Sequence, residues 1–227
     1  SAYFLLSDFN GTVTKGNHQI RLGDKKVAAI LTSIRNTVIA GLVLAVIMVV
    51  ALMYWHAGSL TFDMAWGTFF MRWLHVLSAI MWIGILWYFN FVQIPTMPSI
   101  PDEMKPAIGK HIAPAALFWF RWGAMATLVT GLLLAWMNGY INDAITLGLM
   151  DGVPKHTAIG IGMWLGAIMW FNVWFIIWPA QKRALGIVEV DADTKAASAR
   201  TAMLFSRTNT LLSFPMLYAM VSAQNLY

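Results

Sequence analysis

The sequence predicts an all-α integral membrane protein with five transmembrane helices. Hydrophobic residues make up 59% of the 227 residues and charged residues only 11%, whereas an average soluble domain has about 25% charged residues. Several apolar stretches reach the ~20 residues that a helix needs to cross a bilayer. Lysine and arginine are concentrated in alternate loops, which is typical of a membrane topology.

Apolar runs of sufficient length place the five spans along the chain. They lie at residues 37–55, 66–94, 114–137, 157–179 and 207–225. This divides the chain into a cytoplasmic tail (1–36), an extra transmembrane helix with its outer loop (37–65) and a four-helix membrane domain (66–227).

The boundaries of the spans follow from local signals. The polar tail before the first span is too long for the charged region of a signal peptide, so we predict an uncleaved anchor. Proline at 95, 98 and 101 predicts that the second span ends there, without a helix across 95–101. Apolar residues among charges predict a surface helix over 186–205.

Charge bias predicts the orientation. Basic residues fill the tail, the loop after span two and the segment after span four, whereas the loops 56–65 and 138–156 hold only Lys155. The positive-inside rule then places the N-terminus in the cytoplasm and the C-terminus outside. We expect the tail to dock on a partner or on the cytoplasmic loops, because large apolar residues cluster near its start.

The most informative side chain is His75, an ionisable group inside an apolar span. Such a residue is costly in lipid and therefore indicates a functional site. Arg72, His75, Ala79 and Trp82 recur at helical spacing and share one face. One interpretation is an axial haem ligand at His75, with Arg72 pairing a propionate and Trp82 packing against the macrocycle edge. The other is a hydrogen bond between helices.

Other residues limit the chemistry. The chain has no cysteine, which excludes iron–sulfur clusters and covalent c-type haem attachment. Acidic residues are not clustered in the sequence, so we expect no zinc or di-iron site built by the protein. His156 and Met163 are the candidates for a second axial ligand. Asn172 is expected to join two helices.

Four sequence blocks resemble the membrane domain of bacterial membrane-bound urate oxidases, or urate hydroxylases. The blocks are Arg72-Trp73-Leu74-His75 through Gly84, Phe118 through Trp122, Trp164 through Arg183, and Arg207 through Leu217. The first block is also similar to membrane protoporphyrinogen oxidases and copper-resistance membrane proteins. The resemblance covers roughly residues 66–225 and implies the bacterial inner membrane as location.

This sequence also departs from that family pattern. The family usually continues into a C-terminal cytochrome c domain, which we expect to be missing here. It also tends to have histidines near the positions of Gly160 and Thr208. A urate-oxidising site would lack those groups in this chain.

Two functional hypotheses follow. The first is a subunit of a larger respiratory or photosynthetic electron-transfer complex, with a b-type haem or a chlorin pigment at His75; carotenoid and quinone are further cofactor candidates. The second is a stand-alone membrane haem oxidoreductase that passes electrons to a separate cytochrome c. Both imply the lipid bilayer and membrane-protein subunits as partners and no nucleic acid.

Overall fold

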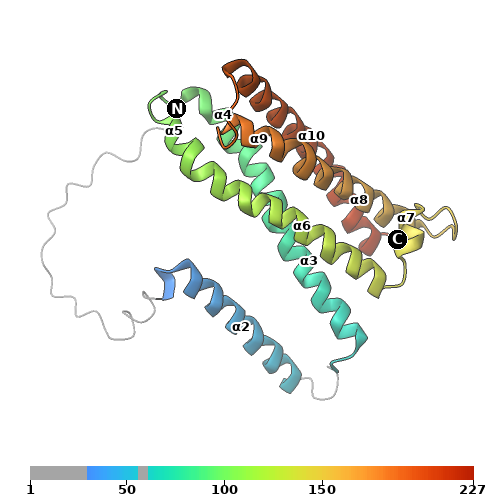
Figure 1. Ribbon diagram of the computed structural model, residues 1–227. Coiled ribbons are helices and arrows are strands. Elements are labelled where there is room, and N and C mark those ends of the chain that lie inside the picture. The colour runs from blue at the N-terminus through green and yellow to red at the C-terminus, as the bar shows by residue number, and fades with distance from the viewer. Residues whose placement is uncertain (1–29, 56–60) are drawn as a thin grey trace, which may run out of the picture. The chain divides into compact units, whose positions relative to one another are not determined.

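The computed structural model describes residues 30–55 and 61–227 (Figure 1). Within these residues every regular element is helical and there is no β-strand. The chain divides into two compact units, Ser1–Thr61 and Phe62–Tyr227. The predicted docking of the N-terminal tail concerns residues that lie mostly outside the described part of the chain.

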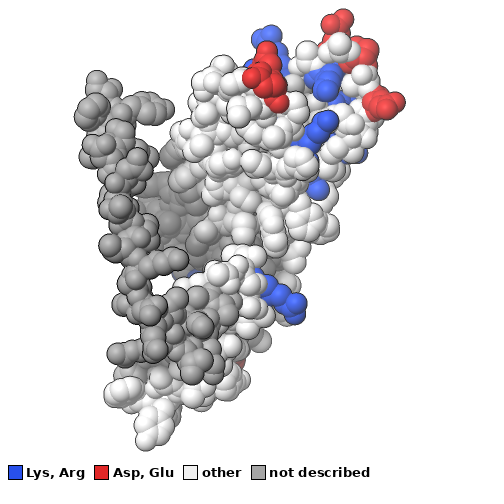
Figure 2. All heavy atoms as spheres, turned by 90° about the vertical axis from the view of Figure 1, so that its left-hand side faces the viewer, with Lys and Arg blue, Asp and Glu red and all other residues white. Residues whose placement is uncertain are grey.

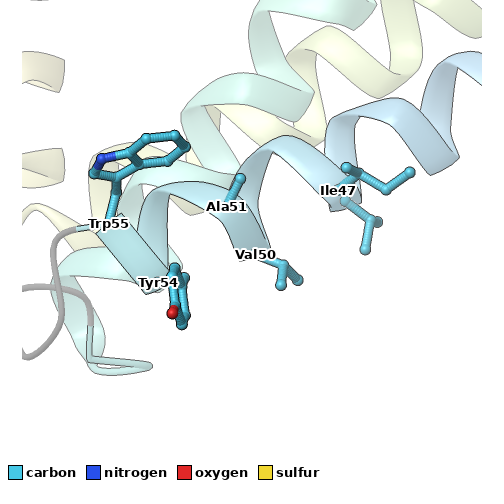
Figure 3. Close-up of a pocket in the computed structure, with 6 residues that line it drawn as sticks. Ile47, Val50, Ala51, Tyr54 and Trp55 are labelled. Atoms are coloured by element: carbon cyan, nitrogen blue, oxygen red, sulfur yellow. The ribbon is translucent and has the colours of Figure 1, made fainter.

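The described part of the first unit is α2 (Ile34–Trp55). This helix is apolar around its whole circumference and has no buried residue. The open hollow shown in Figure 3 is lined by α2 residues alone, between Val46 and Trp55. It is therefore a feature of one helix surface, and we assign it no role as a binding site.

The second unit is a helical bundle. Its elements are α3 (Met64–Trp87), η1 (Tyr88–Gln93), α4 (Ile94–Thr96), η2 (Met97–Ser99), α5 (Lys105–Ala107), η3 (Ile108–Ile112), α6 (Ala113–Met137), α7 (Ile141–Ile145), α8 (Pro154–Phe171), η4 (Asn172–Ile177), α9 (Trp178–Ala184) and α10 (Ala192–Asn225). The helix α3 begins at Asp63, whose side chain accepts a hydrogen bond from the amide of Trp66, a standard N-cap.

Three short π-helical segments explain how the long helices pass through proline. Each of η1, η3 and η4 is followed at once by an α-helical segment with proline in its first turn, namely Pro95, Pro114 and Pro179. The residue before each proline bonds five residues back, as Ile94 does to Phe89. The wider turn accommodates a residue that lacks an N–H and clashes with the preceding turn of an α-helix.

This finding corrects one boundary predicted from the sequence. Proline does not end the second span at 95, because helical structure continues through α4 and the 3₁₀ turn η2 to Ser99. The region 101–104 is a set of turns, and the next helix begins only at Lys105. The prolines therefore change the type of helical turn at the end of this span but do not prevent helical structure there.

Within residues 30–55 and 61–227, four helices are long and apolar enough to cross a membrane. They run over Ile34–Trp55, Met64–Ser99, Lys105–Met137 and Pro154–Ala184. They coincide with the first four predicted spans. The fifth predicted span falls within α10, which does not meet the same measure of hydropathy, so this crossing remains a prediction.

The helix α10 is one continuous element of 34 residues. The separate surface helix that we predicted over 186–205 is thus wrong: residues from Ala192 onward continue directly into the predicted fifth span. α10 packs along α8, which lies beside it in the bundle (Figure 1). Its buried positions are mostly small or polar residues, among them Ser198, Ser206, Asn209 and Ser213.

The core lies between two helix pairs, α3 with α6 and α8 with α10. Trp82, Leu86, Phe120 and Met169 are among its fully buried members. On the face of the molecule that Figure 2 shows, the side chains of Lys, Arg, Asp and Glu gather mainly at one end. Large apolar side chains cover much of the remaining surface, as expected for a protein surrounded by lipid.

Candidate functional site

His75 lies on α3 against α6. Its Nδ1 is 3.0 Å from the backbone carbonyl oxygen of Thr127 and 3.1 Å from the hydroxyl oxygen of Thr130. A carbonyl oxygen only accepts hydrogen bonds, so Nδ1 carries the proton and donates. The Thr130 hydroxyl itself donates to Ala126 O at 2.6 Å, which leaves its oxygen as a second acceptor for His75.

This hydrogen bond fixes the tautomer of the imidazole. In the neutral ring with the proton on Nδ1, Nε2 holds the free lone pair. A histidine that ligates a metal commonly donates its other nitrogen to a backbone carbonyl, which orients the ring and strengthens the ligand. His75 therefore has the carbonyl partner that commonly orients an axial ligand, and the same contact also fits the simpler description of a hydrogen bond between helices.

Gly131 provides the space for the His75 ring. A Cβ added at Gly131 would lie 2.9 Å from Cε1 of His75, closer than real side-chain contacts allow. The glycine is needed here for close approach rather than for an unusual backbone angle. The glycine thus allows α6 to pack closely against the imidazole ring of His75 on α3.

The other members of the predicted face separate into two environments. Trp82 is 2% exposed and packs inside the core, where its backbone nitrogen lies 3.2 Å from the position of a Cβ on Gly123. It is enclosed by protein, so the structure gives no support to its predicted role at the edge of a macrocycle. Arg72 is exposed and lies near enough to Tyr140 to influence it electrostatically.

Polar residues of α7, of the following loop and of the first turn of α8 come together beside Tyr140. Asp143, Asp151 and His156 place one potential ligand atom each within 4.8 Å of one another. His156 Nδ1 hydrogen-bonds the carboxylate of Asp151, and its ring lies 5.6 Å from that of Tyr140. We had expected no such cluster, because the three residues are separated in the sequence.

The electrostatics of this cluster follow from its contacts. The hydrogen bond from His156 lowers the pKa of Asp151, and a second bond from the Val153 amide acts in the same direction. Burial raises the pKa of Tyr140, and nearby Arg72 opposes that shift. Two carboxylates and an imidazole can ligate a divalent cation, but the Asp151–His156 pair equally accounts for this arrangement as an ion pair.

The loop that builds the cluster turns back on itself. Gly148 and Gly152 have φ of 68° and 70°, the left-handed region that favours glycine. Both glycines lie between Asp143 and His156 in the sequence, so their turns bring the two acids near the start of α8. Glycines between acidic residues were the only signal in the sequence that could have indicated this proximity.

Met163 and His156, the candidates for a second axial ligand, both lie near Tyr140. Met163 packs against the buried group that includes Tyr140, Ala144 and Ile159. His156 uses one ring nitrogen for Asp151. Neither is recorded in contact with His75 in the described part of the chain, whose packing partner is α6.

Asn172 joins two helices, as the sequence predicts. Its Nδ2 donates to Oδ1 of Asn209 over 2.8 Å, and Asn209 Nδ2 donates to the backbone oxygen of Met169 over 2.9 Å. Both asparagines are buried. This pair fixes α10 against α8 and η4, and leaves neither side chain directed at a ligand.

Gly160 and Thr208, the positions near which the resemblance predicts histidines, have structural roles here. A Cβ at Gly160 would overlap the carbonyl oxygen of Ala144 in α7. The hydroxyl of Thr208 donates to Leu204 O in its own helix, and the residue is exposed. A histidine at 160 would require α7 to move away from α8.

Comparison with known proteins supports a relationship over part of the chain. The sequence model of a family described as urate oxidase N-terminal matches residues 153–226. This range comprises α8, η4, α9 and α10, together with His156 and Met163, but not His75. No curated protein and no solved structure matches the chain. The resemblance over residues 66–152 remains a prediction.

Proposed function

We propose that this chain is an integral membrane subunit of an electron-transfer assembly and that it binds a b-type haem through Nε2 of His75. The observation that carries the proposal is the hydrogen bond from His75 Nδ1 to the Thr127 carbonyl. It leaves the ligating nitrogen free and holds the ring in one orientation. Gly131 adds the space that this orientation needs.

The residues present fit such a group in two respects. The donor is a neutral imidazole inside an apolar bundle, which is the common axial ligand of b-type haem. Arg72, one turn from His75, is exposed and available to pair with a propionate. His156 and Met163 are candidates for the opposite axial position on the sequence alone, because His156 hydrogen-bonds Asp151 and Met163 packs beside Tyr140. A bound haem would supply one-electron transfer, whereas the protein sets its potential through ligand, burial and hydrogen bonds.

The assignment to an assembly rests on α2. This helix has no buried residue in its own unit and is apolar on all sides, so a surface of this kind needs lipid or protein around it, and we propose that other membrane-protein subunits supply part of that cover. If the group at His75 is instead a chlorin, the same nitrogen would hold it. The protein can be purified in mild detergent and the mass of the native particle measured. A mass well above that of one chain indicates an assembly, whereas the mass of one chain indicates a free monomer.

A stand-alone oxidoreductase related to urate oxidase is the second candidate. The family match over residues 153–226 favours it. Against it stands the close contact of Gly160 with Ala144, which leaves no room for the histidine of the resembled family. Urate added to the purified protein with a separate cytochrome c tests this candidate: reduction of the cytochrome that depends on urate would establish it over the first.

Reduced-minus-oxidised absorption spectra test the main proposal. We expect b-type Soret and α bands in the wild type, none in His75→Ala, and unchanged bands in His111→Ala. His111 precedes Thr127 by 16 residues, or roughly 24 Å of helix, so it cannot reach the same iron. A chlorin spectrum in place of the b-type bands would mean that His75 binds a chlorin pigment instead of haem. Bands that survive in His75→Ala would reject the site.

A further inference from the structure

A second cavity lies near the end of the bundle opposite His75. Its volume is about 270 Å³. All three π-helical segments contribute to its wall, through residues such as Phe89 of η1, Ile108 of η3 and Ile177 of η4. π-helical turns are frequently found at functional sites. Gln93 lies 18 residues beyond His75, or roughly 27 Å along the helix, so this cavity is separate from the proposed haem site.

The wall is apolar with a few polar groups. Phe89 and Phe120 both line it and pack edge to face with ring centres 6.2 Å apart. The polar members are Gln93, Gln181 and Ser206. This composition, apolar and aromatic with a small number of hydrogen-bonding groups, is typical of sites for small organic ligands. The volume accommodates a single substituted ring and not a macrocycle.

One oxygen atom in the wall of this cavity lacks a hydrogen-bond donor, namely Oε1 of Gln93. Oδ1 of Asn90, which does not line the cavity but contacts the lining residue Ser206, is also buried without a partner. Asn90 Nδ2 donates to Leu86 O over 2.9 Å and to Ser206 Oγ over 2.8 Å. Because Leu86 O can only accept, the orientation of the Asn90 amide is fixed and its oxygen is the orphaned atom.

Ser206 connects this network to the cavity. Its hydroxyl oxygen accepts from Asn90, which leaves its own proton for another acceptor. Gln93 offers an acceptor oxygen and Ser206 a donor hydrogen from opposite helices, η1 and α10. A phenolic hydroxyl satisfies both, because it donates one hydrogen bond and accepts another.

We propose that this cavity binds the hydroxylated aromatic headgroup of a quinol. The aromatic side chains match the ring, and the unpaired oxygen of Gln93 together with the Ser206 hydroxyl matches a phenolic O–H group. The cavity is lined by helices that span the apolar part of the protein, so the lipid-soluble tail of the quinol can remain in the bilayer. The unpaired acceptor of Gln93 favours the quinol over the quinone, which has no hydrogen to donate.

Binding of a short-chain ubiquinol to the full chain in nanodiscs tests the proposal. Quenching of tryptophan fluorescence, corrected with empty nanodiscs, reports binding. The O,O-dimethyl ether of the same quinol serves as the matched probe, because it keeps the ring and the tail but cannot donate. We expect the quinol to bind about tenfold more tightly than the ether, as expected for one lost hydrogen bond.

Variants locate the site. Gln93→Leu and Ser206→Ala should each weaken quinol binding about tenfold, and Ala199→Leu should weaken it by filling the cavity. Gln224→Leu is the matched control, because Gln224 is exposed at the far end of α10, and its binding should equal the wild type. Circular dichroism and thermal unfolding establish that each variant is folded.

The outcomes separate this proposal from its competitors and from the haem proposal. Equal binding of quinol and ether, or full binding by folded Gln93→Leu, would show a cavity that takes lipid chains and would overturn the proposal. No binding of quinol to the wild type would overturn it as well. Since His75→Ala leaves this cavity intact, loss of haem in that variant with retained quinol binding distinguishes the two sites.

Discussion

The side-chain amide of Asn172 donates a hydrogen bond to Oδ1 of Asn209 across 2.8 Å, between two buried residues on different helices. Inside a bundle surrounded by lipid, neither amide has water as an alternative partner. The pair therefore sets the register between α8–η4 and α10. It also gives the inward-facing Asn209 of α10 a structural role.

We expect Asn172→Ala to destabilise the bundle by about 1–3 kcal/mol, because it leaves the Asn209 oxygen buried without a donor. Unfolding by a denaturing detergent measures the change. Asn225→Ala is the control, since Asn225 is exposed and bonds only within its own helix. Equal stability of the two variants would mean that the pair does not hold the helices together.

Gly131→Ala tests the space around His75. The new Cβ would lie 2.9 Å from the imidazole, so we expect the ring to lose its bond to Thr127 and the variant to lose about 1–3 kcal/mol of stability. The b-type absorption bands should weaken in parallel. Gly166→Ala, where no atom lies within 4 Å of the added Cβ, should keep both its stability and its spectrum.

The hydrogen-bonded pair of Asp151 and His156 predicts that the stability of the folded protein falls in acid. The pKa of Asp151 is lowered in the folded protein from its ordinary value of 3.8. The stabilisation is therefore present above that value and is lost as the pH falls through the lower, folded pKa. Thermal unfolding between pH 2 and 6 should show a loss of melting temperature in acid that is smaller in Asp151→Asn.

Asp193→Asn is the control for that measurement, because Asp193 lies in the first turn of α10 and away from the cluster. Its melting temperature should depend on acid as that of the wild type does. If Asp151→Asn shows the full acid dependence of the wild type, the pair contributes nothing to stability.

Membrane topology is testable because the chain has no cysteine. Single cysteines at Met150 and Leu226, both exposed, should react with an impermeant maleimide from outside, whereas a cysteine at Glu189 should not. The Leu226 result decides whether α10 crosses. Labelling of Met150 and Glu189 as expected, with Leu226 protected, would restrict the protein to four crossings.

α10 shows why hydropathy alone does not settle that crossing. Its inward positions include Ser198, Ser206 and Ser213, whereas Leu211 and Tyr218 are 68% and 66% exposed. Small polar residues allow close packing between membrane helices, and the apolar residues face outward. The average over the whole helix is low because its first half exposes charged residues such as Lys195, Arg200 and Arg207, whereas the exposed residues between Leu211 and Val221 are mainly apolar, as a fifth crossing requires.

Much of the fold was predictable because it follows from long apolar runs, which place α2, α3, α6 and α8 correctly. The extent of the second span was not, since Pro95 ends an ordinary α-helix and only the π-helical turn of η1 allows it to continue. Proline indicates only that the ordinary α-helix is interrupted. It does not say whether the chain leaves the helix or continues through a π-helical turn.

The candidate sites divide in the same way. His75 could be identified from its position within an apolar span, and its contact with α6 follows from the cost of a polar group in lipid. The cluster of Asp143, Asp151 and His156 could not, because a loop brings it together. The cavity at Gln93 was equally hidden, since four helical segments separated in the sequence form its walls.

Chemical rescue of the ligand tests the central claim most directly. His75→Gly removes the imidazole and leaves a space that free imidazole can enter. We predict that this variant shows no b-type bands alone and regains them when imidazole is added with haem, whereas His111→Gly never loses them. Bands that persist in His75→Gly without imidazole, or that do not return with it in the folded protein, would contradict the assignment of His75 as the ligand.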